Sequence, residues 1–124
     1  MTSVTNRPAI DQKTMRRHAS SAARLVRALS SEHRLMVLCA LAGGELSVGA
    51  LNELVTLSQS ALSQHLAVLR KEGLVTTRRE AQTIYYQVTP GIALDVVQLL
   101  HDHYCGTTRP APRKAAARRS GARA

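Results

Sequence analysis

The two cysteines and the histidines near the second of them carry the most distinctive chemistry in this chain. Cys39 lies in the first third of the 124 residues and Cys105 near the end, and His101 and His103 come shortly before Cys105. A thiolate attacks sulfane sulfur, and a second thiol can capture the persulfide that forms. A protonated His101, one helical turn before Cys105, favours the thiolate, whereas the C-terminal end of a helix disfavours it. The sequence leaves the balance of these two effects open.

Each thiol also has a plainer interpretation. Cys39 flanks the apolar face of a predicted helix, where a cysteine commonly serves as a small hydrophobic residue. Alternatively, His101, His103 and Cys105, with Cys39 as a fourth ligand, would suit zinc or a similar metal ion. His103 does not share the helix face of His101 and Cys105, which weakens this alternative. We therefore expect no resident cofactor or metal.

A second set of polar residues lies on one face of a helix predicted over 59–72. At about 100° per residue, Leu62, Leu66 and Leu69 fall on the side that faces the core. The opposite side carries small and amide-bearing side chains, which suit base edges in a DNA major groove because glutamine pairs with adenine and serine donates or accepts. The free N–H groups at the start of the helix suit a phosphate. The predicted DNA-contacting residues of this helix are Ser58, Gln59, Ser60, Ser63, Gln64 and His65, and an ordinary polar role is the alternative for His65.

A hairpin is predicted over 75–88, where β-branched and aromatic residues alternate with polar ones. It carries Arg78, Arg79 and Gln82, which are placed to contact the DNA backbone or minor groove. Helices predicted over 48–55 and 59–72, joined by a three-residue turn and followed by this hairpin, have the order of a winged helix. A solvated surface is the alternative for each feature alone, but their combination favours DNA binding.

The remaining elements are helices predicted over 11–29, 32–42 and 91–104. The last of these is apolar around most of its circumference, which a small monomer cannot bury, so we infer a homodimer with this helix and the first at its interface. The expected fold class is mainly α with a small β-hairpin wing, a homodimeric winged helix-turn-helix. We divide the chain into a disordered arm (1–10), a DNA-binding and dimerisation domain (11–106) and a basic disordered tail (107–124).

The net charge of +9 is concentrated near the two ends of the chain, and the middle is slightly acidic. Charge alone therefore does not locate a nucleic-acid site, and the tail either adds nonspecific phosphate affinity or keeps the protein soluble. No apolar run approaches the roughly 18 residues of a membrane span, and no secretory signal is visible. We expect a cytoplasmic, nucleoid-associated protein without a membrane partner. No phosphate loop, nucleophile–base pair or paired-carboxylate motif indicates an enzyme.

Over residues 22–105 the chain resembles the ArsR-type winged-helix repressors, in the runs ALSSEHRLMVLCAL and LSVGALNELVTLSQSALSQHLAVLRKEGLVTTRREAQTIYYQV. The resemblance implies a bacterial homodimer that occupies an imperfect operator palindrome and blocks transcription until an inducer binds. Many members of the family sense metals. One of their sites needs two thiols where this chain has residues 45–49, which contain none, and the other needs a histidine spacing that the last helix lacks.

The pair Cys39 and Cys105, with the wing run RREAQTIYY, resembles the branch of the family that senses reactive sulfur. The resemblance implies that persulfides or polysulfides link the two thiols of one subunit, that the operator is released, and that sulfide-detoxification genes are derepressed. A metal-responsive repressor using His101, His103 and Cys105 is one alternative function. A protein-interaction module without operator specificity is another. The operator sequence, the target genes, the inducer and the number of bridging sulfur atoms stay open, as does the question of whether haem or a metal also binds.

Overall fold

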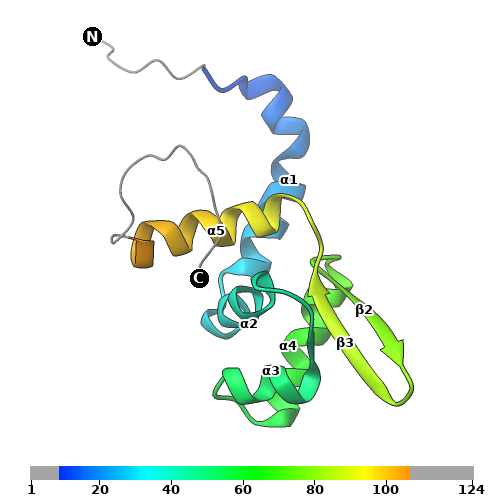
Figure 1. The fold of residues 1–124 in the computed structure, drawn as a ribbon. Helices are drawn as coiled ribbons and strands as arrows, with labels where there is room; N and C mark the ends of the chain where they lie inside the picture. Colours follow the sequence, from blue (N-terminus) through cyan, green and yellow to red (C-terminus); the bar gives the residue numbers. More distant parts are fainter. Residues whose placement is uncertain (1–8, 107–124) are drawn as a thin grey trace.

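The computed structural model describes residues 9–106, and the predicted arm and tail lie outside this range except for Ala9 and Ile10, which precede the first helix. The elements in chain order are α1 (Gln12–Leu29), α2 (Glu32–Ala42), β1 (Leu46–Ser47), α3 (Val48–Leu54), α4 (Gln59–Lys71), β2 (Val75–Glu80), β3 (Thr83–Val88) and α5 (Ile92–Cys105). All the predicted helices and the hairpin are present, with ends within about one residue of those expected (Figure 1).

Side-chain caps fix where the central helices begin. Ser31, Ser47 and Ser58 each accept a hydrogen bond from the backbone N–H three residues later, at 3.0–3.2 Å. Such caps satisfy backbone donors that have no partner inside the helix. Helix α4 ends as predicted, because Gly73 takes a φ of 76° and the N–H of Leu74 donates to the carbonyl of Leu69 at 2.9 Å.

The core is built from aliphatic side chains. Its largest fully buried members are Leu38, Leu41, Leu51, Leu62, Leu69 and Val37. Helical periodicity predicts inward faces on α2 and α3, and the structure corrects each of them. The residues predicted to point inward are Leu35, Leu38, Leu41 and Ala42 in α2, and Val48, Leu51, Leu54 and Val55 in α3. In α2, Val37 is buried and Ala42 is exposed. In α3, Val55 is buried as predicted, but Leu54, the last residue of the helix, is 61% exposed.

The sheet has three strands in the order β1-β3-β2, all antiparallel. Strand β1 was not predicted, since its two residues carry no periodic pattern and form a strand only by pairing with Tyr85 and Tyr86 of β3. The hairpin turns at Ala81, whose φ of 57° is left-handed. That conformation costs a residue other than glycine about 1–2 kcal/mol, so the tip is closed at some expense of stability.

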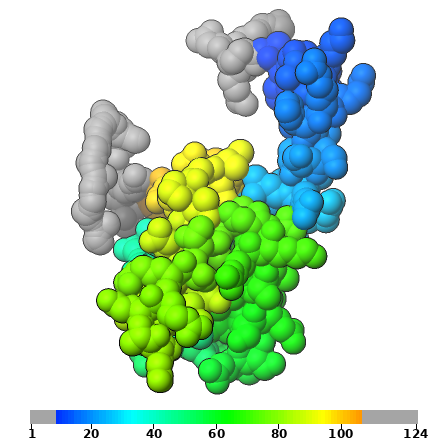
Figure 2. Space-filling view, turned by 90° about the vertical axis from the view of Figure 1, so that its right-hand side faces the viewer, coloured from blue at the N-terminus to red at the C-terminus, as the bar shows by residue number. Residues whose placement is uncertain are grey.

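Helix α1 stands off from the rest of the molecule along most of its length (Figures 1 and 2). Only Ala28 and Leu29 of this helix are buried, and Met15 and Val26 are exposed. In α5, Leu99 is exposed as well. Large apolar side chains on two helices are therefore left without cover in a single protomer.

Candidate nucleic-acid interface and thiol pair

Helices α3 and α4 are joined by a turn that a side-chain hydrogen bond stabilises. The side-chain amide of Asn52 donates to the backbone carbonyl of Leu57 at 2.9 Å. Sequence reasoning missed Asn52, because its partner is a main-chain atom across the turn and no motif marks it. Together with the serine caps, this bond fixes the angle between the two helices of the helix-turn-helix.

The outward face of α4 has the composition expected for reading bases. Leu62, Leu66 and Leu69 are buried as predicted, and they hold the helix against the core. The predicted contact residues Gln59, Ser60, Ser63 and Gln64 are all exposed. No hydrogen bond or ion pair to another residue of the described range occupies these four side chains. Ser58 is exposed too, and its hydroxyl is engaged in capping the helix.

His65 does not belong to this outward face. It is half-buried on the side of α4 that meets α2, where its ring centroid lies 5.5 Å from that of His33. Burial, and then the charges of Arg34 and His33, lower the pKa of His65 below its ordinary value. The structure therefore places His65 between two helices, and its contact with DNA stays a prediction.

In the wing, the two arginines have different surroundings. Arg79 and Gln82 are exposed, with no ion pair to any residue in the described part of the chain. Arg78 donates from Nε and Nη2 to the carboxylate of Glu45, both at 2.9 Å, and from Nη1 to Glu80 at 3.2 Å. These bonds, that of Glu45 first, raise the pKa of the Arg78 guanidinium. The sequence predicted that Arg78 contacts DNA, and it did not predict the ion pairs with Glu45 and Glu80.

The two thiols belong to helices that pack together, α2 and α5. Cys39 and Cys105 are both free and exposed. Partial burial raises the pKa of the Cys39 thiol, and a negative charge on Cys105 raises it further. The fold thus places two thiols that are far apart in sequence on two helices that pack against each other.

The histidines of α5 do not assemble a metal site. His101 Nδ1 lies 3.7 Å from an Asp102 carboxylate oxygen, and the ring of His103 meets Tyr104 edge to face at 4.6 Å. Among residues 9–106, no group of three or more histidine, cysteine or acidic side chains is placed to hold a metal ion. The structure does not bring His101, His103 and Cys105 together as a ligand set.

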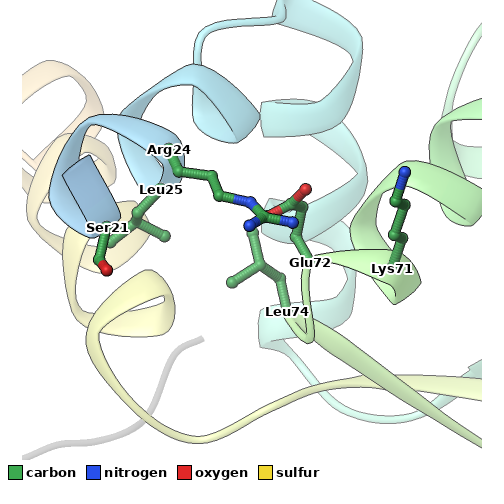
Figure 3. A pocket seen from close by; sticks show the side chains of 6 residues that line it. All are labelled: Ser21, Arg24, Leu25, Lys71, Glu72 and Leu74. Carbon is green, nitrogen blue, oxygen red and sulfur yellow. The ribbon is translucent and has the colours of Figure 1, made fainter.

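An open pocket separates the end of α4 from α1 (Figure 3). The side chains of Arg24 and Glu72 point toward one another across it and form an ion pair at 2.7 Å, while Lys71 points away. This exposed pair contributes little to stability. It does connect α1 to the end of α4, the second helix of the helix-turn-helix.

Comparison with known proteins identifies the family to which the chain belongs. A model of the bacterial regulatory proteins of the ArsR family matches residues 31–77. The transcriptional activator HlyU of Vibrio cholerae is 48% identical over 91 residues, which are 73% of this chain and 84% of HlyU. The biofilm growth-associated repressor of Xylella fastidiosa is 38% identical over 105 residues, 85% of this chain and 92% of that protein. The chain belongs to the ArsR family.

Solved structures of ArsR-family proteins agree with this fold. Reduced HlyU of Vibrio cholerae has a TM-score of 0.71 at 47% identity and covers 75% of this chain and 98% of its own. The repressor BigR of Xylella fastidiosa has a TM-score of 0.72 at 38% identity, covering 77% and 98%. A possible ArsR-family regulator of Mycobacterium bovis, described as a homodimeric winged helix-turn-helix domain, reaches 0.62 at 28% identity, covering 79% and 94%.

The family resemblance and fold class predicted from the sequence are confirmed. This ArsR-family chain is a DNA-binding transcriptional regulator related to BigR and HlyU, and it is not an enzyme. Within the described residues, no helix combines the length and apolarity that crossing a bilayer requires.

Proposed function

We propose that this ArsR-family regulator is a cytoplasmic homodimeric repressor that binds an imperfect operator palindrome through α4 and the wing. Linking Cys39 to Cys105 within one subunit lowers its affinity for the operator and derepresses sulfide-detoxification genes. Reactive sulfur species act as the inducer. The exposed apolar residues of α1 and α5 support the dimer, because Leu99 of α5 and Val26 of α1 have no cover in one protomer.

One observation supports the thiol switch: α2, which carries Cys39, packs against α5, which ends at Cys105. Both thiols are exposed, so a small inducer can reach them. The raised pKa of Cys39 keeps this thiol protonated to higher pH than a free cysteine. We therefore assign the first attack to Cys105 and the second to Cys39.

The chemistry balances with an inorganic polysulfide as oxidant. The Cys105 thiolate attacks a sulfane sulfur, an S–S bond of the polysulfide breaks, and the shortened polysulfide leaves with the electron pair. Cys105 then carries a persulfide. Cys39 loses its proton to solvent and attacks the Cys105 Sγ, and hydrosulfide leaves. The two thiols have given up two electrons, and the polysulfide sulfur has gained them as sulfide. If Cys39 is itself a persulfide when it attacks, its extra sulfur stays in the bridge.

Intact mass under denaturing, non-reducing conditions tests this order of attack. After sodium tetrasulfide, the wild-type chain is expected to lose two hydrogens, with or without retained sulfur, to keep the mass of one chain, and to resist alkylation at both thiols. Cys39→Ser is expected to gain one sulfur atom at Cys105, because the persulfide has no thiol to capture it. Cys105→Ser is expected to react more slowly. If both thiols of the treated wild type could still be alkylated, the thiol switch would be ruled out. Parallel treatment with diamide, which oxidises thiols without supplying sulfur, separates sulfur transfer from general oxidation.

Linking the thiols would join the helix α2, on which α4 packs, to α5. In a dimer held through α5, a change at this junction alters the spacing of the two α4 helices. Half-sites on DNA lie about one turn apart, so the two reading helices must keep that spacing. This gives the bridge a physical route to the operator.

Operator reading by α4 is expected to depend on Gln64. A glutamine that pairs with a base edge supplies about 1–3 kcal/mol of discrimination, so Gln64→Ala should weaken operator binding by that amount and relax preference at one position of each half-site. Gln98→Ala, an exposed glutamine on α5, is the matched control. Fluorescence anisotropy with a duplex of about 30 base pairs, enriched by the reduced protein from a random library, measures both. Equal binding by the two variants would contradict a base contact by Gln64.

A further inference from the structure

The side chain of Arg78 extends across one face of the sheet, from β2 over β3 to the segment that precedes β1. Arg78 lies opposite Tyr85 of β3 in the antiparallel register, and Tyr85 in turn lies opposite Ser47 of β1. The guanidinium sits 4.6 Å from the centre of the Tyr85 ring and continues to Glu45, just before β1. One arginine thus spans β2, β3 and the segment leading into β1.

The contacts of Arg78 are of the kind that orients a side chain. Its two bonds to Glu45 are parallel and equal in length, 2.9 Å each, which is the forked geometry that arginine and carboxylate favour. A third bond to Glu80 and the contact with the Tyr85 ring make it a network. Isolated surface ion pairs contribute little, but forked geometry and a network are the cases in which they matter.

The charges leave Arg78 little attraction for a phosphate. Two carboxylates, from Glu45 and Glu80, contact its guanidinium, so the group as a whole is negative. Neighbouring residues of a strand point to opposite faces, so Arg79 projects away from this network. In the wing it is Arg79 that remains exposed and without an ion pair among the described residues.

The position of Glu45 connects the network to the helix-turn-helix. Ser47, two residues later, caps α3, the first helix of that motif. Fixing Arg78 to Glu45 therefore fixes the hairpin relative to α3 and, through the turn at Asn52, relative to α4.

We propose that Arg78 is a positioning residue of the wing, which holds Arg79 and Gln82 at a constant offset from α4, and that it is not a phosphate contact. The inference rests on DNA binding through the wing, which is part of the proposed function, and it is independent of the thiol switch. Arg79 then supplies the wing's electrostatic attraction, and Arg78 supplies the geometry.

Amide hydrogen exchange on the reduced, DNA-free protein tests the positioning role directly. Arg78→Lys keeps the charge but cannot form the fork. It is expected to speed exchange in β3 by roughly fivefold, and Glu45→Gln should do the same. The double variant should add nothing further. Arg79→Gln, one position away, is the matched control and should leave exchange unchanged. Wild-type exchange in both Arg78→Lys and Glu45→Gln would overturn the proposal.

The salt dependence of DNA binding separates the two arginines. The slope of log affinity against log salt becomes shallower by about 0.9 for each phosphate that the protein no longer neutralises. Arg79→Gln is expected to reduce the slope by about twice that value in a dimer, and Arg78→Gln to weaken binding severalfold with the slope unchanged. An equal reduction of the slope in Arg78→Gln and Arg79→Gln would make Arg78 a phosphate contact. Absence of sequence preference in the wild type would contradict the proposed function, while the exchange result would still decide the role of Arg78.

Discussion

Sodium tetrasulfide is expected to lower the operator affinity of the reduced wild-type protein by roughly 5- to 150-fold, the range of ordinary allosteric coupling. The reason is that the bridge requires Cys39 and Cys105 to approach each other, which constrains α2 against α5. Cys39→Ser and Cys105→Ser should bind the operator like the reduced wild type and keep that affinity after treatment. Fluorescence anisotropy at fixed salt measures all three proteins, since affinity for DNA varies steeply with salt.

Two further observations make this result interpretable. Dithiothreitol should restore the affinity of the treated wild type, because a disulfide or polysulfide bridge is reducible. A Cys39→Ser protein that still releases its operator would contradict the paired-thiol switch and point to modification of Cys105 alone. Serine is close to cysteine in size, and both positions are exposed, so loss of folding does not compete with this interpretation.

Leu62→Ala is expected to destabilise the protein by about 2–5 kcal/mol, whereas Leu54→Ala should cost well under half as much. Leu62 is 0% exposed near the start of α4, so its truncation leaves a cavity beneath the helix. Leu54 is 61% exposed at the end of α3, so its truncation removes mainly surface that already faces water. Urea unfolding at one protein concentration measures both, because the stability of a dimer depends on concentration.

The same substitution at two leucines of neighbouring helices makes each variant the control for the other. Equal destabilisation would contradict the placement of Leu54 on the surface. It would also restore the face of α3 that helical periodicity predicts, on which Leu54 points inward.

Local signals sufficed for most of the fold. Serine caps, the Gly73 stop and the leucine spacing of α4 act within a few residues, so the sequence predicts these helices and the buried side of α4 correctly. The exposed serines and glutamines of α4 follow from the same spacing. The predicted face of α3 was wrong at Leu54, the last residue of the helix, which is exposed although Leu51 and Val55 are buried as predicted.

What the sequence could not predict depends on partners far along the chain. Strand β1 exists only because β3 pairs with it. In the sequence, Arg78 looks like a basic wing residue that is free to contact DNA. Its partner Glu45 precedes it by a loop, a strand and two helices, and only the fold brings the two side chains together. His65 likewise looks like part of the outer face until α2 packs against that flank of α4. In each case a tertiary contact supplies a neighbour that the local sequence does not indicate.

The aliphatic core gives the protein an optical property suited to its proposed role. With no tryptophan or phenylalanine, its intrinsic fluorescence comes from tyrosine alone. Tyr85 and Tyr86 lie in the wing strand β3, and Tyr104 directly precedes Cys105. The fluorescent side chains thus lie in the wing and next to Cys105, and the aliphatic core contributes no fluorescence. Tyrosine fluorescence of the unlabelled chain is therefore a probe of the wing and of the surroundings of Cys105.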